Sequence, residues 1–314
     1  MTSTRTAIAW LCVSSALVGI SACSQTSGAD SPASSQTAPL EAAVTPAPTN
    51  AAPATTVPVI AAPTTAATTT AAPTTVAPTT TEAPATTAAP PTTIPSNLVV
   101  VGPAAVPIAG VGKSNGADTF ALQERLNALG FWAGIPDGQY GFASVQAVMA
   151  FQKYIGLPAT GSVDGTTAEY LTAFGEKAHG TADNGTLVEV DKARQLLFIV
   201  VDGQTLLTFN TSTGSGIPYE AINKNDPTKI EKGDSITPNG LYKTTRERPE
   251  GWWEGDLGKI YRPKYFVGGV AIHGMTSVPN YPASHGCVRL STMAMDVIWE
   301  TGLVPVGTPV WVHE

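Results

Sequence analysis

A long tract of alanine, threonine and proline occupies much of the first third of this chain. It runs from Ser24 to about Gly112 and holds almost no charged or aromatic residues, as in "PTTAATTTAAPTTVAPTTTEAPATTAAPPTT". Such a composition cannot bury enough apolar surface to offset the conformational entropy lost on folding, and its prolines favour extended conformations. We therefore predict a disordered linker over residues 24–114 and expect folded domains only after it.

The residues before this tract have the features of an export signal. A short apolar run, Ala7–Ile20, follows Arg5 and is too short to span a bilayer comfortably. It leads into "ISAC", which resembles the lipobox of bacterial lipoproteins. The resemblance implies that residues 1–23 are a signal peptide, that Cys23 carries a lipid, and that the exported protein is held at the outer face of the cytoplasmic membrane and in the cell wall. Ordinary cleavage beside an incidental cysteine is the alternative.

Charge and cysteine content narrow the function classes. A net charge of −7 and a pI near 5.1 argue against a nucleic-acid binder, which would carry a basic patch, and against a polybasic membrane-surface protein. Of the three cysteines, Cys12 lies inside the predicted signal and Cys23 would be lipidated. Cys287 is then the free thiol of the mature protein. In an oxidising compartment a free thiol can be oxidised unless it is buried or has a chemical function.

Residues 115–176 predict a small helical domain. The spacing in "DTFALQERLNALGFW" places Leu122, Leu126 and Leu129 on one helical face, and Gly130 ends the helix. A second helix is expected in "SVQAVMAFQKYIG" and a short third helix after "LPATGSVDG". The stretches "LQERLNALGFW", "DGQYG" and "VMAFQKYIGLPATGSVD" closely resemble the peptidoglycan-binding domain type 1. The resemblance implies cell-wall binding, and a spacer domain without a ligand is the alternative.

Residues 185–314 predict a mostly-β domain. Short β-rich runs such as "QLLFIVVDG", "KYFVGGVAIHG" and "GTPVWVHE" are separated by glycine, asparagine and aspartate turns. One helix is expected in "STMAMDVIWETG", with Met295, Ile298 and Trp299 as its apolar stripe and Gly302 as its end. The predicted fold class is therefore multi-domain: a long disordered linker, a three-helix domain, and a β-sandwich-like domain with one packed helix.

Three reactive side chains lie close together in this last domain: His273, His285 and Cys287. A thiol attacks as its thiolate, and a neighbouring imidazole can accept its proton. His273 ends an apolar strand, where a nearby backbone carbonyl can orient its ring. His285 and Cys287 are two residues apart, which in an extended segment places both on one face. Gly286 between them lets peptide N–H groups face a developing oxyanion.

Other interpretations of these residues exist. A buried thiol with a structural histidine is the simplest, and the polar, glycine-containing "SHGC" argues against it. A zinc site with His273, His285 and Cys287 as ligands is chemically suitable, but the spacing fits no recognised zinc pattern. A non-catalytic wall-binding lipoprotein is a third interpretation, against which the intact "HG" and "SHGC" argue.

The stretch "IHGMTSVPNYPASHGCVRLS" resembles the signature of L,D-transpeptidases with a YkuD-type catalytic domain. The resemblance covers the whole domain, through "LVEVDKARQLLFIVVDGQ", "TSTGSG", "TPNGLYKTT" and "GTPVWV". It implies that Cys287 is the nucleophile and His273 the general base, supported by His285. It further implies that the amides of Gly286 and Cys287 form an oxyanion hole, and that the Gly274 carbonyl orients His273.

Two more residues of the signature receive roles from the same resemblance. Ser284 is expected to hydrogen-bond within the loop, and Arg289 either to order the loop or to meet a substrate carboxylate. The insert "YEAINKNDPTKIEKGDS" and the pair Trp252–Trp253 form either a flap over the site or a surface loop. Tyr261 and Tyr265 either line the donor groove or pack in the core.

The resemblance also implies a reaction. The Cys287 thiolate attacks the diaminopimelate carbonyl of a tetrapeptide stem, D-alanine leaves, and the amine of a second stem resolves the thioester into a 3→3 cross-link. No cofactor or metal is required. The expected partners are donor and acceptor peptidoglycan stems, the membrane through the lipid anchor, and carbapenem-type β-lactams as inhibitors, but no nucleic acid. Water as acceptor would give an L,D-carboxypeptidase, and a protein lysine would give protein-to-wall anchoring.

Overall fold

The structure is a computed structural model that describes residues 97–314. The predicted signal peptide, Cys23 and residues 24–96 of the predicted linker lie outside the described residues. The described residues belong to one compact unit of the chain. Among them, no helix has both the length and the apolar character needed to cross a membrane.

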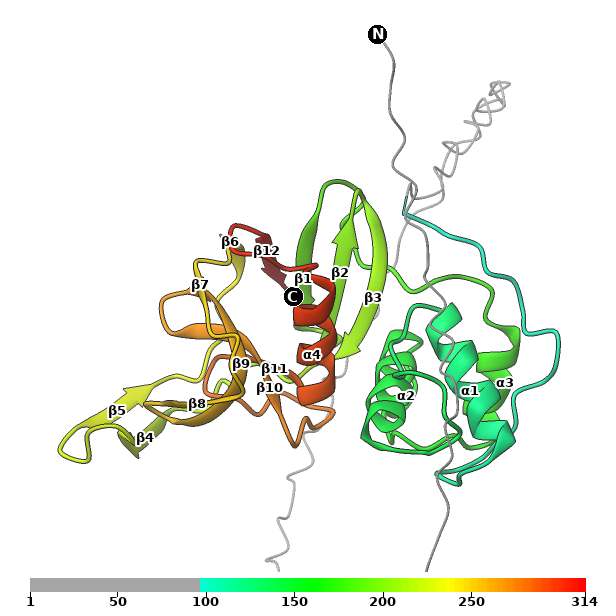
Figure 1. Ribbon diagram of the computed structural model, residues 1–314, viewed down its shortest axis with the longest axis horizontal. Coiled ribbons are helices and arrows are strands. Elements are labelled where there is room, and N and C mark those ends of the chain that lie inside the picture. The colour runs from blue at the N-terminus through cyan, green and yellow to red at the C-terminus, as the bar shows by residue number, and fades with distance from the viewer. Residues whose placement is uncertain (1–96) are drawn as a thin grey trace, which may run out of the picture. The chain divides into compact units, whose positions relative to one another are not determined.

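The three predicted helices of the first domain are present (Figure 1): α1 (Ala117–Ala128), α2 (Phe142–Tyr154) and α3 (Gly165–Ala173). Leu122, Leu126 and Leu129 are fully buried, as their helical spacing predicts. Asp164 caps α3, because its Oδ1 accepts the Thr167 N–H at 2.8 Å. The helical domain therefore has the compact core that its length demands.

The folded part begins earlier than the predicted linker boundary at residue 114. Residues 97–114 lie against the helices, and the N–H groups of Val101 and Gly102 donate to the Gly175 carbonyl at 2.7 and 2.8 Å. These contacts are made by the backbone, so the side-chain composition of the segment gave no sign of them.

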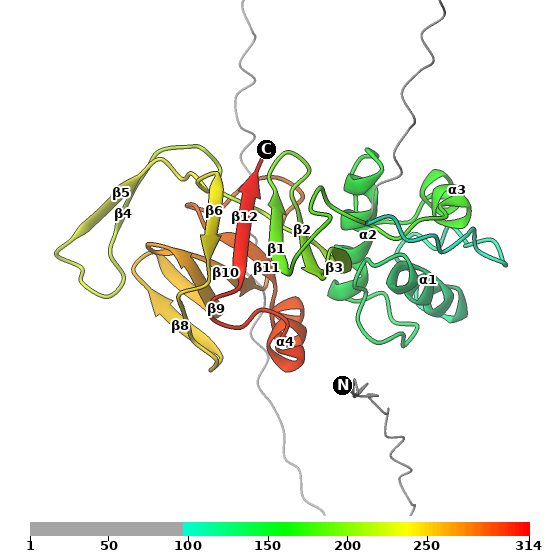
Figure 2. The ribbon, with the colours of Figure 1, turned by 90° about the horizontal axis from the view of Figure 1, so that it is seen from above.

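Two sheets and a two-stranded ribbon form the mostly-β domain (Figures 1 and 2). The first sheet has the order β3-β2-β1-β12-β6, and the second has the order β11-β10-β9-β7 with β8 beside β9. The third is the ribbon β4–β5. The bounds are β1 (Leu187–Asp191), β2 (Leu196–Val201), β3 (Gln204–Asn210), β4 (Tyr219–Ile222), β5 (Ile230–Gly233), β6 (Gly240–Lys243), β7 (Arg246–Glu247), β8 (Trp252–Gly255), β9 (Gly258–Val267), β10 (Val270–Met275), β11 (Val288–Ser291) and β12 (Pro309–His313).

The predicted helix after the cysteine is α4 (Thr292–Thr301), which packs against β9, β10 and β11. Ser291 caps it by accepting the Ala294 N–H at 3.0 Å, and Gly302, at φ +63°, ends it in the left-handed conformation. Apolar residues of both sheets and of α4 form one buried cluster. A helical domain followed by a mostly-β domain with a packed helix is therefore confirmed.

Strand β2 is buried on both faces, which explains its uninterrupted apolar sequence "LLFIVV". Leu197 and Ile199 belong to the cluster between the sheets, whereas Leu196, Phe198 and Val200 belong to the cluster with the helices. Because side chains alternate along a strand, consecutive apolar residues serve two cores. The helical domain thus covers the outer face of the first sheet.

Candidate active site

The parallel pair β10–β11 brings the predicted nucleophile and base to one face of the second sheet. His273 lies opposite Arg289 in the register. Two residues earlier, the Ala271 N–H donates to Cys287 Sγ at 3.5 Å. Because alternate residues of a strand share a face, His273 and Cys287 lie on the same side of the sheet.

The ring of His273 is held in one tautomer by the backbone. Its Nδ1 lies 3.1 Å from the carbonyl oxygen of Gly274, and since a carbonyl only accepts, Nδ1 carries the hydrogen. The Nε2 lone pair is therefore free to take a proton. A side chain at Gly274 would be crowded, because its Cβ would lie 3.0 Å from the Cα of Thr292. The backbone role predicted for Gly274 agrees with this geometry.

Burial keeps both reacting groups uncharged. The imidazole of His273 is only 3% exposed, and burial lowers its pKa to about 4, against which the Gly274 carbonyl acts to raise it. Burial also raises the pKa of the Cys287 thiol, although the Ala271 N–H and the charge of Arg289 act in the opposite direction. At neutral pH the site holds a neutral thiol and a neutral base, so the thiol proton moves when the sulfur attacks.

The loop that carries the nucleophile is fixed by Ser284. This buried hydroxyl accepts the Gly286 N–H at 3.0 Å and donates to the Cys287 carbonyl at 2.5 Å. Gly286 has φ +130°, and a Cβ there would lie 2.9 Å from the Ile236 carbonyl oxygen. The hydrogen-bonding role expected of Ser284 is present. The Gly286 amide, however, is engaged with Ser284, which differs from the expectation that it faces an oxyanion.

His285 faces the β4–β5 ribbon. Its exposed ring lies against the ring of Tyr219, with centroids 4.5 Å apart. Partial burial, and then the charge of Arg289, lower its pKa. Sequence reasoning missed Tyr219 as a residue of the site, because only the paired ribbon brings it to the cysteine loop.

A cleft of about 670 Å³ opens over these residues. The ribbon β4–β5 and Trp253 line it, and Asn225 Nδ2 donates to Asp256 Oδ1 at 3.0 Å, which ties the ribbon to the β8–β9 turn. The sequence allows two interpretations of the insert, either a flap over the site or a surface loop. The structure therefore favours the flap. The cleft is lined by Tyr219, Asn225, Glu231, Arg246, Arg248, Trp253, Gly255, Asp256, Leu257, Gly258, Lys259, Ile260, Tyr265, Gly269, Val270, His273, Met275, Ser284, His285, Cys287 and Arg289.

Arg289 and the two tyrosines of β9 occupy different environments. Arg289 is half-buried in the cleft wall, while its backbone pairs with Ser212. Tyr265 lines the cleft beside it, although only 7% of its surface is exposed. Tyr261 instead donates its hydroxyl to Asp296 Oδ1 of α4 at 2.9 Å. One tyrosine thus belongs to the cleft and the other to the packing of the domain.

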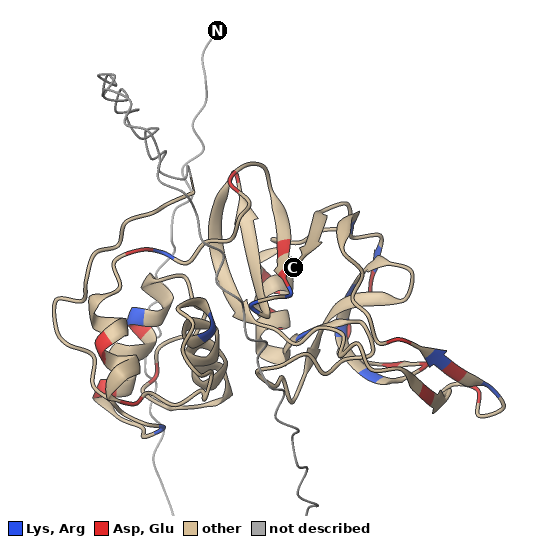
Figure 3. Cartoon of the chain, turned by 180° about the vertical axis from the view of Figure 1, so that it is seen from behind, with Lys and Arg blue, Asp and Glu red and all other residues tan. Residues whose placement is uncertain are grey.

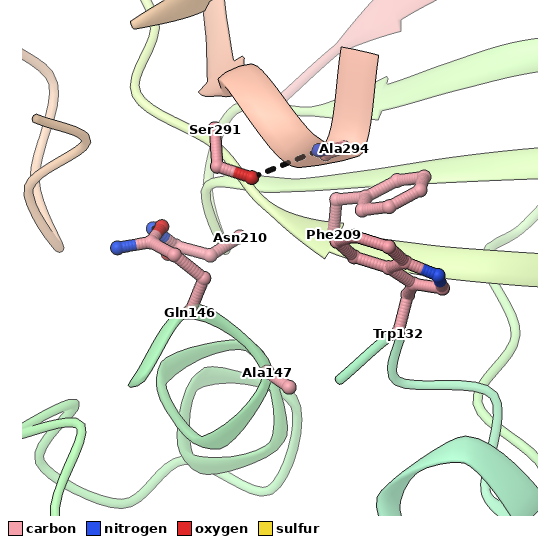
Figure 4. A pocket seen from close by; sticks show the side chains of 7 residues that line it. All are labelled: Trp132, Gln146, Ala147, Phe209, Asn210, Ser291 and Ala294. Carbon is pink, nitrogen blue, oxygen red and sulfur yellow. Dashed lines mark hydrogen bonds between the residues drawn. The ribbon is translucent and has the colours of Figure 1, made fainter. Parts of the chain in front are cut away.

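A second cavity, of about 10 Å³, lies between α2, β3 and α4 (Figure 4). There Asn210 Nδ2 donates to Gln146 Oε1 at 2.7 Å, and Gln146 Nε2 donates to the Val278 carbonyl at 3.1 Å. Space of this size holds at most one water molecule. It is not a substrate site, but its polar side chains join α2 to the segment that leads to Cys287.

Residues suited to metal binding do not gather in the described part of the chain. Within residues 97–314, no three histidine, cysteine, aspartate or glutamate side chains are arranged to hold a metal ion.

Comparison with known proteins agrees with this geometry. The YkuD family of L,D-transpeptidase catalytic domains matches residues 185–312, and a peptidoglycan binding domain family matches residues 115–171. A crystal structure of an L,D-transpeptidase (residues 123–326) from Xylanimonas cellulosilytica is 39% identical, with a TM-score of 0.58, and the match covers 67% of this chain and 100% of that one. The chain belongs to the L,D-transpeptidase family, and both domain resemblances seen in the sequence are confirmed.

Two further comparisons are more distant. An L,D-transpeptidase structure from Stackebrandtia nassauensis is 23% identical, with a TM-score of 0.37, and covers 67% of this chain and 98% of that one. The spore cortex-lytic enzyme of Bacillus cereus is 34% identical over 73 residues, which are 23% of this chain and 28% of the relative. The chain thus spans less than a third of the length of that curated relative.

Proposed function

We propose that this protein is a cell-wall L,D-transpeptidase that forms 3→3 peptidoglycan cross-links through a thioester on Cys287. The observation that carries the proposal is the pairing of groups on one sheet face. A neutral His273, with its Nδ1–H fixed on a carbonyl, lies on the same side of the cleft as the thiol. This arrangement supports a thiol nucleophile with an adjacent base.

In the first step, Cys287 Sγ attacks the carbonyl of the diaminopimelate centre in a tetrapeptide stem. His273 Nε2 takes the thiol proton and then gives it to the departing amine. The bond to the terminal D-alanine breaks as the thioester forms, so free D-alanine leaves with the proton. Because Ser284 holds the Gly286 amide, we assign the oxyanion to the Cys287 N–H.

In the second step, the side-chain amine of another stem attacks the thioester. His273 accepts a proton from this amine and returns it to the sulfur, and the new amide bond is the 3→3 cross-link. A thioester is well suited to attack by an amine, which favours transfer over hydrolysis. Arg289, half-buried in the cleft wall, binds a carboxylate of the stem in this scheme.

The test is incubation of the purified protein with disaccharide-tetrapeptide. We expect release of one D-alanine per acyl-enzyme, an intact-mass increase on Cys287, and a 3→3 dimer. Monomer tripeptide without dimer would identify an L,D-carboxypeptidase instead, and a stem attached to an added lysine protein would identify protein anchoring. The absence of D-alanine release would leave a non-catalytic wall-binding protein. We expect a carbapenem to acylate the same cysteine.

We also propose that the protein is exported and held by a lipid on Cys23, with the Ala/Thr/Pro tract as a tether into the wall. The support is the signal-like sequence that ends in "ISAC". Wild-type protein expressed in its host should sediment with membranes, and Cys23→Ala should shift it to the soluble exported fraction. Membrane retention of the variant at the wild-type level would rule out a lipid on Cys23.

A further inference from the structure

Three arginines lie on the same wall of the cleft as the thiol. On β7, Arg246 pairs with Tyr265 of β9, and Tyr265 pairs with Ala271 of β10, whose N–H contacts Cys287 Sγ. These residues form one row across the sheet, and neighbouring strands are about 4.8 Å apart. Arg248 follows the end of β7, where its N–H donates to the Pro263 carbonyl of β9 at 3.0 Å, and it lines the same cleft. The strand register thus places Arg246 in the row that leads across β9 and β10 to the nucleophile.

Aromatic rings hold two of these guanidinium groups in place. The Cζ of Arg246 lies 3.9 Å above the centre of the Tyr265 ring, and that of Arg248 lies 3.8 Å above the Trp253 ring. Stacking fixes the plane of a guanidinium while its N–H groups stay available at the edge. Tyr265, Arg246, Arg248 and Cys287 all line the cleft, so the stacked arginines and the reacting sulfur face the same space.

Among residues 97–314, no carboxylate lies within ion-pairing distance of Arg246, Arg248 or Arg289. Within the described part of the chain, the one hydrogen bond of the Arg246 guanidinium goes to the Gly268 carbonyl, at 3.3 Å. Neighbouring cations of the same sheet do have partners, since Arg262 pairs with Asp296 at 2.7 Å and Lys264 with Glu247 at 2.8 Å. The three cleft arginines thus lack the carboxylate partners that these two cations of the same sheet have, in a protein of net charge −7.

The acidic residues of the cleft do not neutralise this wall. Glu231 accepts the Asn223 amide at 2.7 Å, and Asp256 accepts the Asn225 amide at 3.0 Å, so both lie with the ribbon and the β8–β9 turn. Elsewhere on the ribbon, basic and acidic residues lie side by side (Figure 3) and pair with each other. The cleft thus has an arginine wall next to the thiol and an acidic side toward the flap.

We propose that Arg246 and Arg248 select the donor stem by binding its free carboxylates, so that a stem with free acids is used in preference to an amidated one. The proposal rests on the transpeptidase function proposed above. Guanidinium groups bind carboxylates through paired hydrogen bonds, and amidation removes both the charge and the acceptor oxygens that such binding needs. The substrate class is a tetrapeptide stem with unmodified isoglutamate and diaminopimelate carboxylates.

The experiment uses two disaccharide-tetrapeptides that differ only in whether these side carboxylates are free or amidated. D-alanine release by the wild-type protein should show a kcat/KM about tenfold higher for the free-acid donor. In the double variant R246Q/R248Q the ratio of the two kcat/KM values should fall to about one. The control K232Q, which removes a ribbon cation paired with Glu220 outside the cleft, should keep the wild-type ratio.

Binding provides a second readout that does not need turnover. With the Cys287→Ala protein, calorimetry should give a tighter Kd for the free-acid donor, and added salt should reduce the difference. Equal use of both donors by the wild type, or an unchanged ratio in the folded double variant, would overturn the selection by arginines while leaving the transpeptidase intact. No D-alanine release from either donor would overturn both proposals.

Discussion

Replacing Cys287 with alanine should lower D-alanine release from a tetrapeptide stem by at least about 10³-fold, because the attacking atom is gone. The wild-type protein should gain the mass of the disaccharide-tripeptide acyl group, and the variant should show no adduct. A carbapenem should modify the wild type and spare the variant in the same way. Both measurements need only intact-mass spectrometry and an assay for free D-alanine.

This loss can be separated from a loss of folding. Among hydrogen bonds of residues 97–314, the Cys287 sulfur takes part in only two, a weak one from Ala271 at 3.5 Å and a long one to the Gly269 carbonyl at 3.9 Å. Ser284 and Thr237 fix the loop through backbone atoms that alanine retains. The variant should therefore unfold within a few degrees of the wild type. Retention of D-alanine release within tenfold would show that Cys287 is not the nucleophile.

Local patterns predicted the helices, and a short motif pointed to the two site residues that the structure places on one sheet face. Leu122, Leu126 and Leu129 are buried because helical spacing decides which side faces the core. His273 is preferred to His285 as the base because the resemblance assigns that role to the histidine of the earlier "HG", and the structure buries His273 with its Nδ1 on the Gly274 carbonyl. In each case the information lay within a few residues of the position concerned.

Features that depend on distant pairing could not be read from the sequence. Arg246 stands on the two-residue strand β7 and Arg248 directly follows it, and nothing near them in the sequence indicates that they line the same cleft as the thiol. The flap interpretation likewise depends on the contact between Asn225 and Asp256. Segment 97–114 is held largely by backbone hydrogen bonds to distant residues, which leave no trace in its own composition.

His273→Gln should lower D-alanine release by about 10²–10⁴-fold, the usual contribution of a general base. Glutamine cannot accept the thiol proton, although it has a similar size and can donate to the Gly274 carbonyl. His285→Ala should cost far less, because that exposed ring contacts Tyr219. Equal losses in the two variants would overturn the choice of His273 as the base, without affecting the assignment of the chain to its family.

The pH dependence follows from the burial of the pair. Since the pKa of His273 is lowered to about 4, the imidazole stays neutral and basic at pH 5–8, and kcat/KM should fall only as the pH approaches 4. If the site instead held a thiolate–imidazolium pair, kcat/KM would fall where the thiolate is protonated, near the pKa of a stabilised thiol. Because burial raises the pKa of Cys287, its alkylation by iodoacetamide should keep rising beyond pH of about 8.5, where an ordinary thiol is half ionised. A plateau of alkylation at neutral pH would establish the ion pair.

The same shift makes folding stability depend on pH. In the unfolded chain, His273 binds a proton below its ordinary pKa of about 6.5. In the folded protein, it binds a proton only near its lowered pKa of about 4. Between these values the unfolded state holds more protons, so the free energy of unfolding falls as the pH falls. The loss through this residue should reach about 3 kcal/mol at pH 4, and His273→Gln should remove it. Denaturant unfolding of both proteins at pH 7 and pH 4.5 measures the difference, and parallel losses in the two would show that His273 is not a buried neutral base.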